Sequence, residues 1–273
     1  MMNKMKKIGA AAMALAMLGS LAACGNNNNA TPSDDNSASN TVYAVEAGSA
    51  GEAIAQENGY EYNSVSSQAD ALMEVASGTS DAAIIDLLMA GAMIGEGTSY
   101  PDLVYTDSLS EEEYGVGCRQ DSDLTDYINN VFAEAYADGT MASLADTYGI
   151  SQDVIIEQGA ASDFTPAEDS DVAYIQDKGT LVVGITEFAP MDYKDSDGSW
   201  IGFDADMAKL VAEKLGVNVE FVVIDWDNKI MELDSKNIDV VWNGMTLTDE
   251  VTSSMNCTNA YFKNAQVVVV PAA

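Results

Sequence analysis

The 273-residue sequence contains no histidine and only one arginine, Arg119. Lys and Arg together number 11 against 44 Asp and Glu, so the formal net charge at pH 7 is −33. Between Cys24 and Lys178, Arg119 is the only basic side chain. Nucleic-acid binding needs Lys and Arg to neutralise phosphates, so this composition excludes nucleic acid as a partner. It is typical of a soluble protein in an aqueous extracellular space.

Motifs of several enzyme classes are also missing. The chain has no GxSxG, P-loop, HExxH or GxGxxG pattern. Asp225 and Asp227 form a carboxylate pair of the kind that a glycosidase uses, but nothing in the sequence places them opposite a substrate. We therefore predict no enzymatic activity and no cofactor.

Cysteine is scarce, with Cys24, Cys118 and Cys257 as the complete set. None lies in a CxxC motif or near a histidine, which excludes a typical zinc site. Cys118 and Cys257 stand in apolar surroundings, "YGVGC" and "MNC", and are expected to be small buried hydrophobic residues. A disulfide between them stays open at this point.

The N-terminus has the pattern of a targeting segment. A basic start, "MMNKMKK", precedes a short apolar stretch that ends in "LAAC", which predicts a signal peptide over residues 1–23. "LAACG" resembles the lipobox of bacterial lipoproteins, and this resemblance implies cleavage before Cys24, a lipid on Cys24, and attachment to the extracytoplasmic face of the cell membrane. A plain signal peptide with a chance cysteine is the alternative. Residues 24–40 are polar and aperiodic, which predicts a flexible tether.

Strand and helix patterns alternate through the rest of the chain. In residues 41–150, "TVYAVE", "DAAIID", "PDLVYTD" and "EYGVGCRQ" predict strands. Helices are predicted near Glu52, before Gly78, after "DAAIID", and on both sides of Gly139. The pattern stops in a predicted linker, 151–170, and restarts near Val172. There "TLVVGIT", "NVEFVVID", "IDVVWNG" and "AQVVVV" predict strands, and "DADMAKLVAEKLG" and "WDNKIMELDSKN" predict helices. This alternation is the signature of an α/β fold with largely parallel sheets.

The second half resembles the first lobe of the amino-acid-binding proteins of bacterial ABC transporters, the extracellular solute-binding proteins of family 3. The motifs are "FAPMDY", "GFDADMAKLVAEKLG", "NIDVVWNGMTLTDE" and "NAYFKNAQVVVV". The first half, from "TVYAVEAGSAGE" through "SDAAIIDLLMAGAMI" to "EYGVGCRQDSDLTDYINN", resembles the second lobe and C-terminal helices of that family. In the family the "LVVGIT" strand comes first, so the resemblance implies a circularly permuted chain.

The resemblance implies a two-lobed, type II periplasmic-binding-protein fold. It assigns lobe 2 to residues 41–113, a hinge strand and helices returning to lobe 1 to 114–150, the linker to 151–170, and lobe 1 with a hinge strand to 171–273. "EYGVG" and "AQVVVV" would be the two strands that cross between lobes. Because the chain stops after "AQVVVV", one hinge connection is expected to be broken and the lobes to be less tightly coupled.

Candidate ligand-binding residues follow from position and from the resemblance. Asn243, Gly244, Met245 and Thr246 come just after a strand, where open α/β sheets bind ligands. The turn Ala47–Gly51 opens a helix and offers free N–H groups. The resemblance gives Asp86 the ligand's ammonium, and it gives Thr186 and Glu46 contacts with the ligand's side chain. Asp86 could instead be a solvated acid at a strand end. Phe188 and Trp226 would be aromatic walls of the site or, equally, core residues. The ligand-binding set is Glu46, Ser49, Ala50, Asp86, Thr186, Phe188, Trp226, Gly244, Met245 and Thr246.

One departure from the family concerns the ligand's carboxylate. The family places an arginine after "TLTDE", but here Val251 stands there, and we expect no nearby Lys or Arg to replace it. Either the backbone N–H groups of the turn Ala47–Gly51 and of Thr246 bind the ligand's carboxylate, or the ligand lacks that carboxylate. With Glu46 and Asp86 both expected at the cleft, a cationic ligand is favoured, either a basic amino acid or a polyamine-like amine.

The sequence thus predicts a monomeric, lipid-anchored solute-binding protein without a metal site. Its partners would be an amino acid or amine, polar or cationic, and an ABC transporter permease. The alternative is a permuted surface relic that binds no solute and acts as an interaction protein.

Overall fold

A computed structural model describes residues 41–273. The predicted signal peptide, tether and lipidation at Cys24 lie outside the described residues. The strands are β1 (Val42–Glu46), β2 (Glu61–Val65), β3 (Ala82–Asp86), β4 (Leu103–Ser108), β5 (Glu112–Cys118), β6 (Thr180–Ile185), β7 (Tyr193–Lys194), β8 (Trp200–Ile201), β9 (Asn218–Val223), β10 (Val240–Thr246), β11 (Asn256–Cys257), β12 (Phe262–Asn264) and β13 (Gln266–Pro271).

Helices alternate with these strands, which confirms the α/β fold class. They are α1 (Ala50–Asn58), α2 (Gln68–Ser77), α3 (Leu87–Met93), α4 (Leu124–Ala137), α5 (Thr140–Thr147), α6 (Asp171–Lys178), α7 (Phe203–Leu215), α8 (Lys229–Asp234) and α9 (Asp249–Ser254), with short 3-10 turns η1 (Gln152–Val154) and η2 (Trp226–Asn228).

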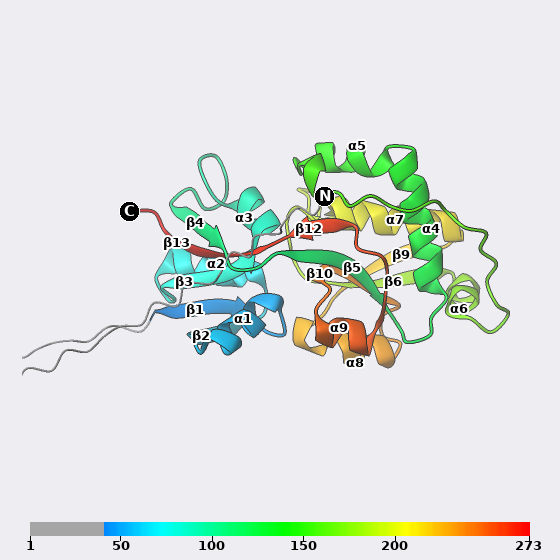
Figure 1. Ribbon diagram of the computed structural model, residues 1–273, viewed down its shortest axis with the longest axis horizontal. Helices are drawn as coiled ribbons and strands as arrows, with labels where there is room; N and C mark the ends of the chain where they lie inside the picture. The colour runs from blue at the N-terminus through cyan, green and yellow to red at the C-terminus, as the bar shows by residue number, and fades with distance from the viewer. Residues whose placement is uncertain (1–40) are drawn as a thin grey trace, which may run out of the picture. The chain divides into compact units, whose positions relative to one another are not determined.

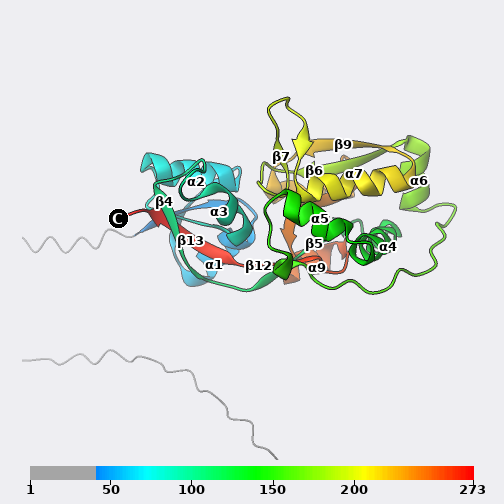
Figure 2. The ribbon, with the colours of Figure 1, turned by 90° about the horizontal axis from the view of Figure 1, so that it is seen from above.

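Two main sheets organise the described residues (Figure 1). The five-stranded sheet has the order β2-β1-β3-β13-β4, and with α1, α2 and α3 we call it the five-stranded lobe. The six-stranded sheet has the order β11-β5-β10-β6-β9, with β12 also paired to β5, and with α4 to α9 we call it the six-stranded lobe. Figure 2 shows α7 and α5 lying over the second sheet.

Each sheet is mixed rather than largely parallel. The pairs β1–β2, β1–β3, β6–β9 and β6–β10 are parallel. In contrast, β13 runs antiparallel to β3 and β4, and β5 runs antiparallel to β10. The antiparallel strands β5 and β13 are the first strands after a passage between the sheets, where the chain enters from the other lobe and runs against the βαβ direction.

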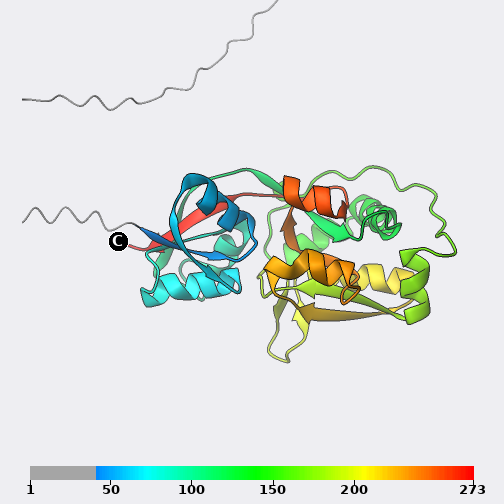
Figure 3. The same cartoon turned by 90° about the horizontal axis from the view of Figure 1, so that it is seen from below.

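Two connections pass between the sheets. The chain goes from β4 to β5 through residues 109–111, and from β12 to β13 through Ala265 (Figures 1 and 3). They lie side by side, since the Leu109 N–H donates to the Gln266 carbonyl at 2.7 Å and the Gln266 N–H donates to the Ser110 hydroxyl at 3.2 Å. The expectation of a broken hinge connection is therefore wrong, because β13 completes its crossing and pairs inside the five-stranded sheet.

Helix ends follow local chemistry. Ser67 caps α2 by accepting a hydrogen bond from the Asp70 N–H at 3.1 Å, and α2 ends at Gly78, which adopts φ 75°. The predicted helices around Gly139 and the helix ended by Gly216 are likewise present. The helix predicted at "WDNKIMELDSKN" is shorter than expected, as η2 followed by the six-residue α8.

The segment 151–170 is irregular apart from η1, and its first part packs against the six-stranded lobe. The Ile156 N–H donates to the Tyr261 carbonyl at 2.9 Å, and the Gln158 amide donates to the Ala260 carbonyl at 2.8 Å. Cys118 and Cys257 are both free. Among residues 41–273, no helix combines the length and apolarity needed to cross a bilayer.

Candidate ligand-binding site

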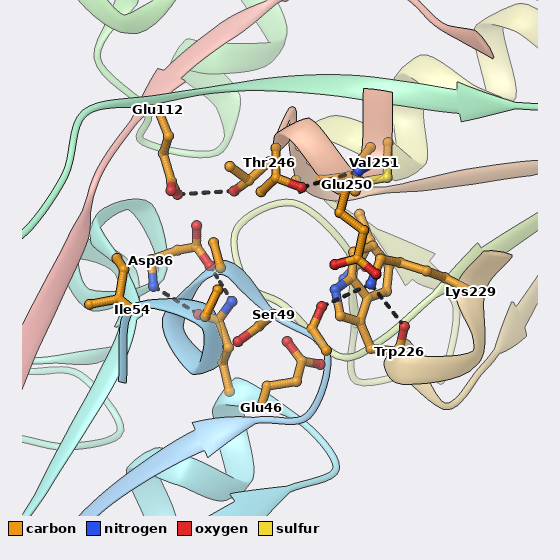
Figure 4. Close-up of a pocket in the computed structure, with 18 of the residues that line it drawn as sticks. Glu46, Ser49, Ile54, Asp86, Glu112, Trp226, Lys229, Thr246, Glu250 and Val251 are labelled. Atoms are coloured by element: carbon orange, nitrogen blue, oxygen red, sulfur yellow. Dashed lines mark hydrogen bonds between the residues drawn. The ribbon is translucent and has the colours of Figure 1, made fainter. Parts of the chain in front are cut away.

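A cavity of about 400 Å³ lies where the two lobes face each other (Figure 4). This volume falls in the range of pockets that bind small molecules. Eight of the ten sequence-predicted residues line it. From the five-stranded lobe these are Glu46, Ser49, Ala50 and Asp86. From the six-stranded lobe they are Trp226, Gly244, Met245 and Thr246.

The secondary structure explains why these residues meet. Glu46 and Asp86 are the last residues of the parallel strands β1 and β3, and Thr246 is the last residue of β10. Carboxyl ends of neighbouring parallel strands share one edge of a sheet, where α/β folds bind ligands. The cavity therefore lies between two such edges, with one set of strand ends on each side.

Asp86 lies at the centre of a hydrogen-bond network. Its carboxylate accepts from the Tyr114 hydroxyl at 2.6 Å and the Gln266 amide at 3.1 Å. The side-chain amides of Gln68 and Asn264 also donate to it. Burial and the neighbouring Glu112 carboxylate raise the pKa of Asp86 well above its ordinary value. Its oxygens are thus already engaged by side chains of the protein itself.

Glu112 is a cavity residue that the sequence analysis did not single out. It accepts from the Thr246 hydroxyl at 3.0 Å, the Asn264 amide at 2.6 Å and the Gln266 amide at 2.7 Å. Asn264 and Gln266 therefore bridge the carboxylates of Asp86 and Glu112. The bridging amides stand on either side of Ala265, so this network fixes the crossing from β12 to β13. No local sequence motif predicts this network, because its residues come from distant parts of the chain.

Glu46 differs from Asp86 because, within the described residues, one of its carboxyl oxygens is left without a hydrogen bond. Its side chain is buried, and among residues 41–273 its Oε1 has no hydrogen-bond partner. Burial raises the pKa of Glu46 to about 8 although the nearby Lys229 ammonium acts in the opposite direction, so this carboxyl is largely protonated at neutral pH. A ligand cation brought to Oε1 would favour the ionised form.

Ser49 and Ala50 form the start of α1. The Ser49 hydroxyl accepts from the Glu52 N–H at 3.1 Å, and the Glu52 carboxylate in turn accepts from the Gly48 N–H at 2.8 Å. The arrangement differs from a capping box because the Glu52 carboxylate accepts from the residue before the N-cap and not from Ser49. The Ser49 N–H donates to the Glu46 carbonyl at 3.2 Å and the Ala47 N–H to the Val65 carbonyl at 2.9 Å. Three amides of the turn Ala47–Gly51 are therefore engaged, so the turn has less anion-binding capacity than its sequence suggests.

Lys229 also lines the cavity, a basic residue that the sequence analysis did not place there when it expected no nearby Lys or Arg to replace the arginine at Val251. Lys229 is the first residue of α8, and Val251 lines the same cavity from α9. Sequence reasoning missed Lys229 because it looked for a substitute close to Val251. The available signal was a basic residue three positions after Trp226, in a chain with few basic residues.

Two predicted residues do not line the cavity. The Phe188 side chain is buried beneath Gly244, where a Cβ on Gly244 would lie 2.4 Å from Phe188 Cε1, and its ring packs edge-on against Tyr114. Thr186 is buried, and its hydroxyl accepts from the Asn243 amide at 2.8 Å. The aromatic wall expected at Phe188 is thus a support for the β10 end, because the ring fills the space that Gly244 leaves.

The acids at the cavity mouth are solvent-exposed, namely Glu57, Asp249 and Glu250. Asp225 and Asp227, the carboxylate pair of the enzyme alternative, are exposed and do not line the cavity. Within the described residues no cluster of three or more His, Cys, Asp or Glu is arranged to hold a metal ion.

Comparisons with known proteins cover the C-terminal third of the chain. Residues 181–273 match the family described as bacterial extracellular solute-binding proteins, family 3. The chain is similar to the probable histidine-binding protein of Neisseria gonorrhoeae, with 37% identity over 90 residues, which are 33% of this chain and 34% of that protein. It is also similar to the L-cystine-binding protein TcyJ of Escherichia coli K12, with 38% identity over 77 residues, 28% of this chain and 29% of that protein.

Another relative is an enzyme, the cyclohexadienyl dehydratase of Pseudomonas aeruginosa, with 31% identity over 91 residues, 33% of this chain and 34% of that protein. Among solved structures, an ancestral cationic amino acid solute-binding protein shares 42% sequence identity over 31% of this chain and 37% of its own, with a TM-score of 0.30. The chain spans about a third of the length of the curated relatives it matches.

Proposed function

We propose that this protein is an extracellular solute-binding protein that captures an amino acid between its two lobes and delivers it to an ABC importer. The observation that carries the proposal is the convergence of residues from both lobes on one cavity of about 400 Å³. The family 3 relationship of residues 181–273 supports the same function, since the relatives named above include histidine- and cystine-binding proteins.

The rest of the assignment is part of the proposal. The protein acts as a monomer, attached to the outer face of the cell membrane through a lipid on Cys24. Its halves stand in the order opposite to that of the family, as a circular permutation. The domain boundaries given from the sequence belong to this proposal as well.

The bound amino acid is polar or cationic. Two observations support this choice: Glu46 offers a buried carboxyl with an unpartnered oxygen, and the acids at the mouth give the entrance a negative potential. Tight binding of an acidic amino acid, measured by calorimetry, would contradict it.

A ligand screen tests the function. Purified protein is heated with each of the twenty amino acids and with simple amines, and a ligand that binds only the folded state raises the melting temperature by mass action. Calorimetry then measures the affinity of each hit for the wild type and for Asp86→Asn, which disturbs the cavity network. Asp225→Asn is the matched control because Asp225 is exposed outside the cavity.

Each outcome has a distinct meaning. We expect one or a few amino acids to raise the melting temperature, Asp86→Asn to weaken binding at least tenfold, and Asp225→Asn to leave it unchanged. Silence across the whole panel would favour the surface relic that binds no solute. Conversion of a bound compound into a new product, detected by mass spectrometry, would favour an enzyme, as the dehydratase among the relatives illustrates.

A further inference from the structure

Lys229 combines three properties that are unusual for a lysine in this chain. Its side chain is 7% exposed, it lines the cavity between the lobes, and within residues 41–273 it makes no ion pair within 4.0 Å. An ammonium removed from water without a countercharge is costly, so such a group is normally paired. The space that Lys229 faces is therefore a place where an anionic group would be stabilised.

The position of the Lys229 ammonium is fixed from both lobes. Nζ donates to the carbonyl of Gly48 in the five-stranded lobe at 2.8 Å and to the carbonyl of Trp226 in its own lobe at 3.3 Å. It also lies 5.1 Å from the centroid of the Trp226 ring. An ammonium has three N–H donors, so two carbonyls leave one donor for a ligand. Figure 4 shows Lys229 and Trp226 on the same side of the cavity, facing Glu46.

The acids near Lys229 do not remove its charge from the cavity. Glu250 and Asp227 are exposed, where solvent screens them. Glu52 is engaged by the Gly48 N–H and by the Ser64 hydroxyl. Glu46 is buried, and burial raises its pKa to about 8, which leaves it largely uncharged at neutral pH. Asp86 and Glu112 also line the cavity, but protein side chains already donate to their carboxyl oxygens. Among the residues that line the cavity, Lys229 is the one basic side chain.

We propose that Lys229 binds the carboxylate of the ligand, so that the cavity selects compounds carrying a free α-carboxylate over their uncharged or decarboxylated counterparts. This inference rests on the proposed function and deepens it. It replaces the sequence-based reasoning in which a lost carboxylate contact opened the cavity to simple amines. The bound carboxylate would sit beside Gly48 and Trp226, and would connect the two lobes through one lysine.

The test uses the full chain and a matched ligand pair. The probe is the amino acid that binds best in the twenty-member screen, compared by calorimetry with its own α-carboxamide, which has nearly the same shape and lacks the negative charge. The proteins are the wild type, Lys229→Gln, Lys229→Arg, and Lys194→Gln. The last variant removes the same charge at an exposed lysine outside the cavity.

We expect the wild type and Lys194→Gln to prefer the acid over the amide at least tenfold. Lys229→Gln should lose this preference by losing affinity for the acid alone, and Lys229→Arg should keep part of it. An unchanged preference in Lys229→Gln overturns the inference, as does an equal loss for acid and amide, which would mean that Lys229 acts only by joining the lobes.

Binding to the wild type distinguishes an error about Lys229 from an error about the proposed function. If the wild type binds the amide as tightly as the acid, the protein is a binding protein and the role of Lys229 is wrong. If the wild type binds no member of the panel, both are overturned. Should Lys229→Gln fold poorly, Lys229→Met takes its place, because it also removes the charge and has an unbranched apolar side chain suited to a buried position.

Discussion

At the scale of single residues, buried carboxyl groups shape both the cavity and the stability of the protein. Burial raises the pKa of Glu46 to about 8 and that of Asp204 to about 7, and it raises the pKa of Asp192 well above its ordinary value. Asp204 accepts from the Gly244 N–H at 2.6 Å and from the Tyr261 hydroxyl at 2.8 Å, so it supports the β10 end from beneath. Because the pKa of each acid is raised in the folded protein, each makes the folded state less stable as the pH rises.

We predict that Glu46 makes the free protein less stable as the pH rises. An acid whose folded pKa is raised holds a proton that the unfolded chain releases near pH 4.5. Its stabilising contribution is complete below that pH and is lost as the pH rises toward 8, with a slope of up to about 1.4 kcal/mol per pH unit. Glu46→Gln keeps the neutral shape, so its unfolding free energy should fall less steeply between pH 5 and 8.5.

Urea unfolding at pH 5, 7 and 8.5 measures this difference. Glu57→Gln serves as the control, because Glu57 lies at the exposed mouth of the same cavity. Parallel curves for the wild type and Glu46→Gln would show that Glu46 is ionised or solvated in the folded protein.

At the scale of elements, the turn before α1 lies directly against η2 of the other lobe. Gly48 adopts φ 71°, and a Cβ there would lie 2.7 Å from Asp227 Cα. The Gly48 carbonyl also accepts from Lys229 at 2.8 Å. The absence of a side chain at Gly48 thus permits the contact between the α1 turn and η2.

We predict that Gly48→Ala holds the lobes apart and weakens ligand binding at least tenfold. The control is Gly59→Ala, because Gly59 has a similar φ of 67° but no atom within 4 Å of the added Cβ. Both variants should lose about 1–2 kcal/mol of stability from the left-handed backbone, while only Gly48→Ala should lose affinity in calorimetry. Equal affinities for the two variants would show that the turn can move without cost to binding.

The same elements show how far the sequence could lead. Hydrophobic alternation and glycine stops located β1, α2, β3 and α7, because each carries its pattern within a few residues. The strand β2, with sequence EYNSV, was missed because most of its side chains are exposed and polar, and its strand state comes from pairing with β1.

Site residues at the ends of strands could be predicted from the sequence. Site residues positioned by contacts between distant parts of the chain could not. Asp86 and Thr246 could be placed because both close a strand. Lys229 could not, since its contact with Gly48 joins residues 181 positions apart. Phe188 was misplaced because a sequence does not show on which side of Gly244 a ring packs.

At the scale of the whole molecule, as described over residues 41–273, the C-terminal strand β13 ends close to the start of β1, as the proposed permutation requires. β13 runs antiparallel to β3 and β1 runs parallel to it, and Val269 pairs with Ala83 while Tyr43 pairs with Ala82. The end of β13 and the start of β1 therefore flank the same part of β3, about 10 Å apart across two strand spacings. Figures 1 and 3 show the C-terminus near the start of β1.

We predict that a chain rejoined in the family's order folds and binds the same ligand. Ala273 would be linked to Thr41 by a few Gly and Ser residues, and the chain would be opened between Pro166 and Ala167, where the backbone is irregular and exposed. Both crossings between the sheets stay intact in this design. Since loop-closure entropy changes slowly with loop length, the unfolding free energy should change by no more than about 1–2 kcal/mol.

Circular dichroism, urea unfolding and calorimetry on the rejoined chain provide the measurement. The expected result is one cooperative transition and a ligand affinity within a few-fold of the original. Loss of folding would contradict the prediction. It would mean that the five-stranded sheet forms only when β1 and β13 are not joined to each other. Retained folding with lost affinity would instead show that a free β13 end is needed for the lobes to close on the ligand.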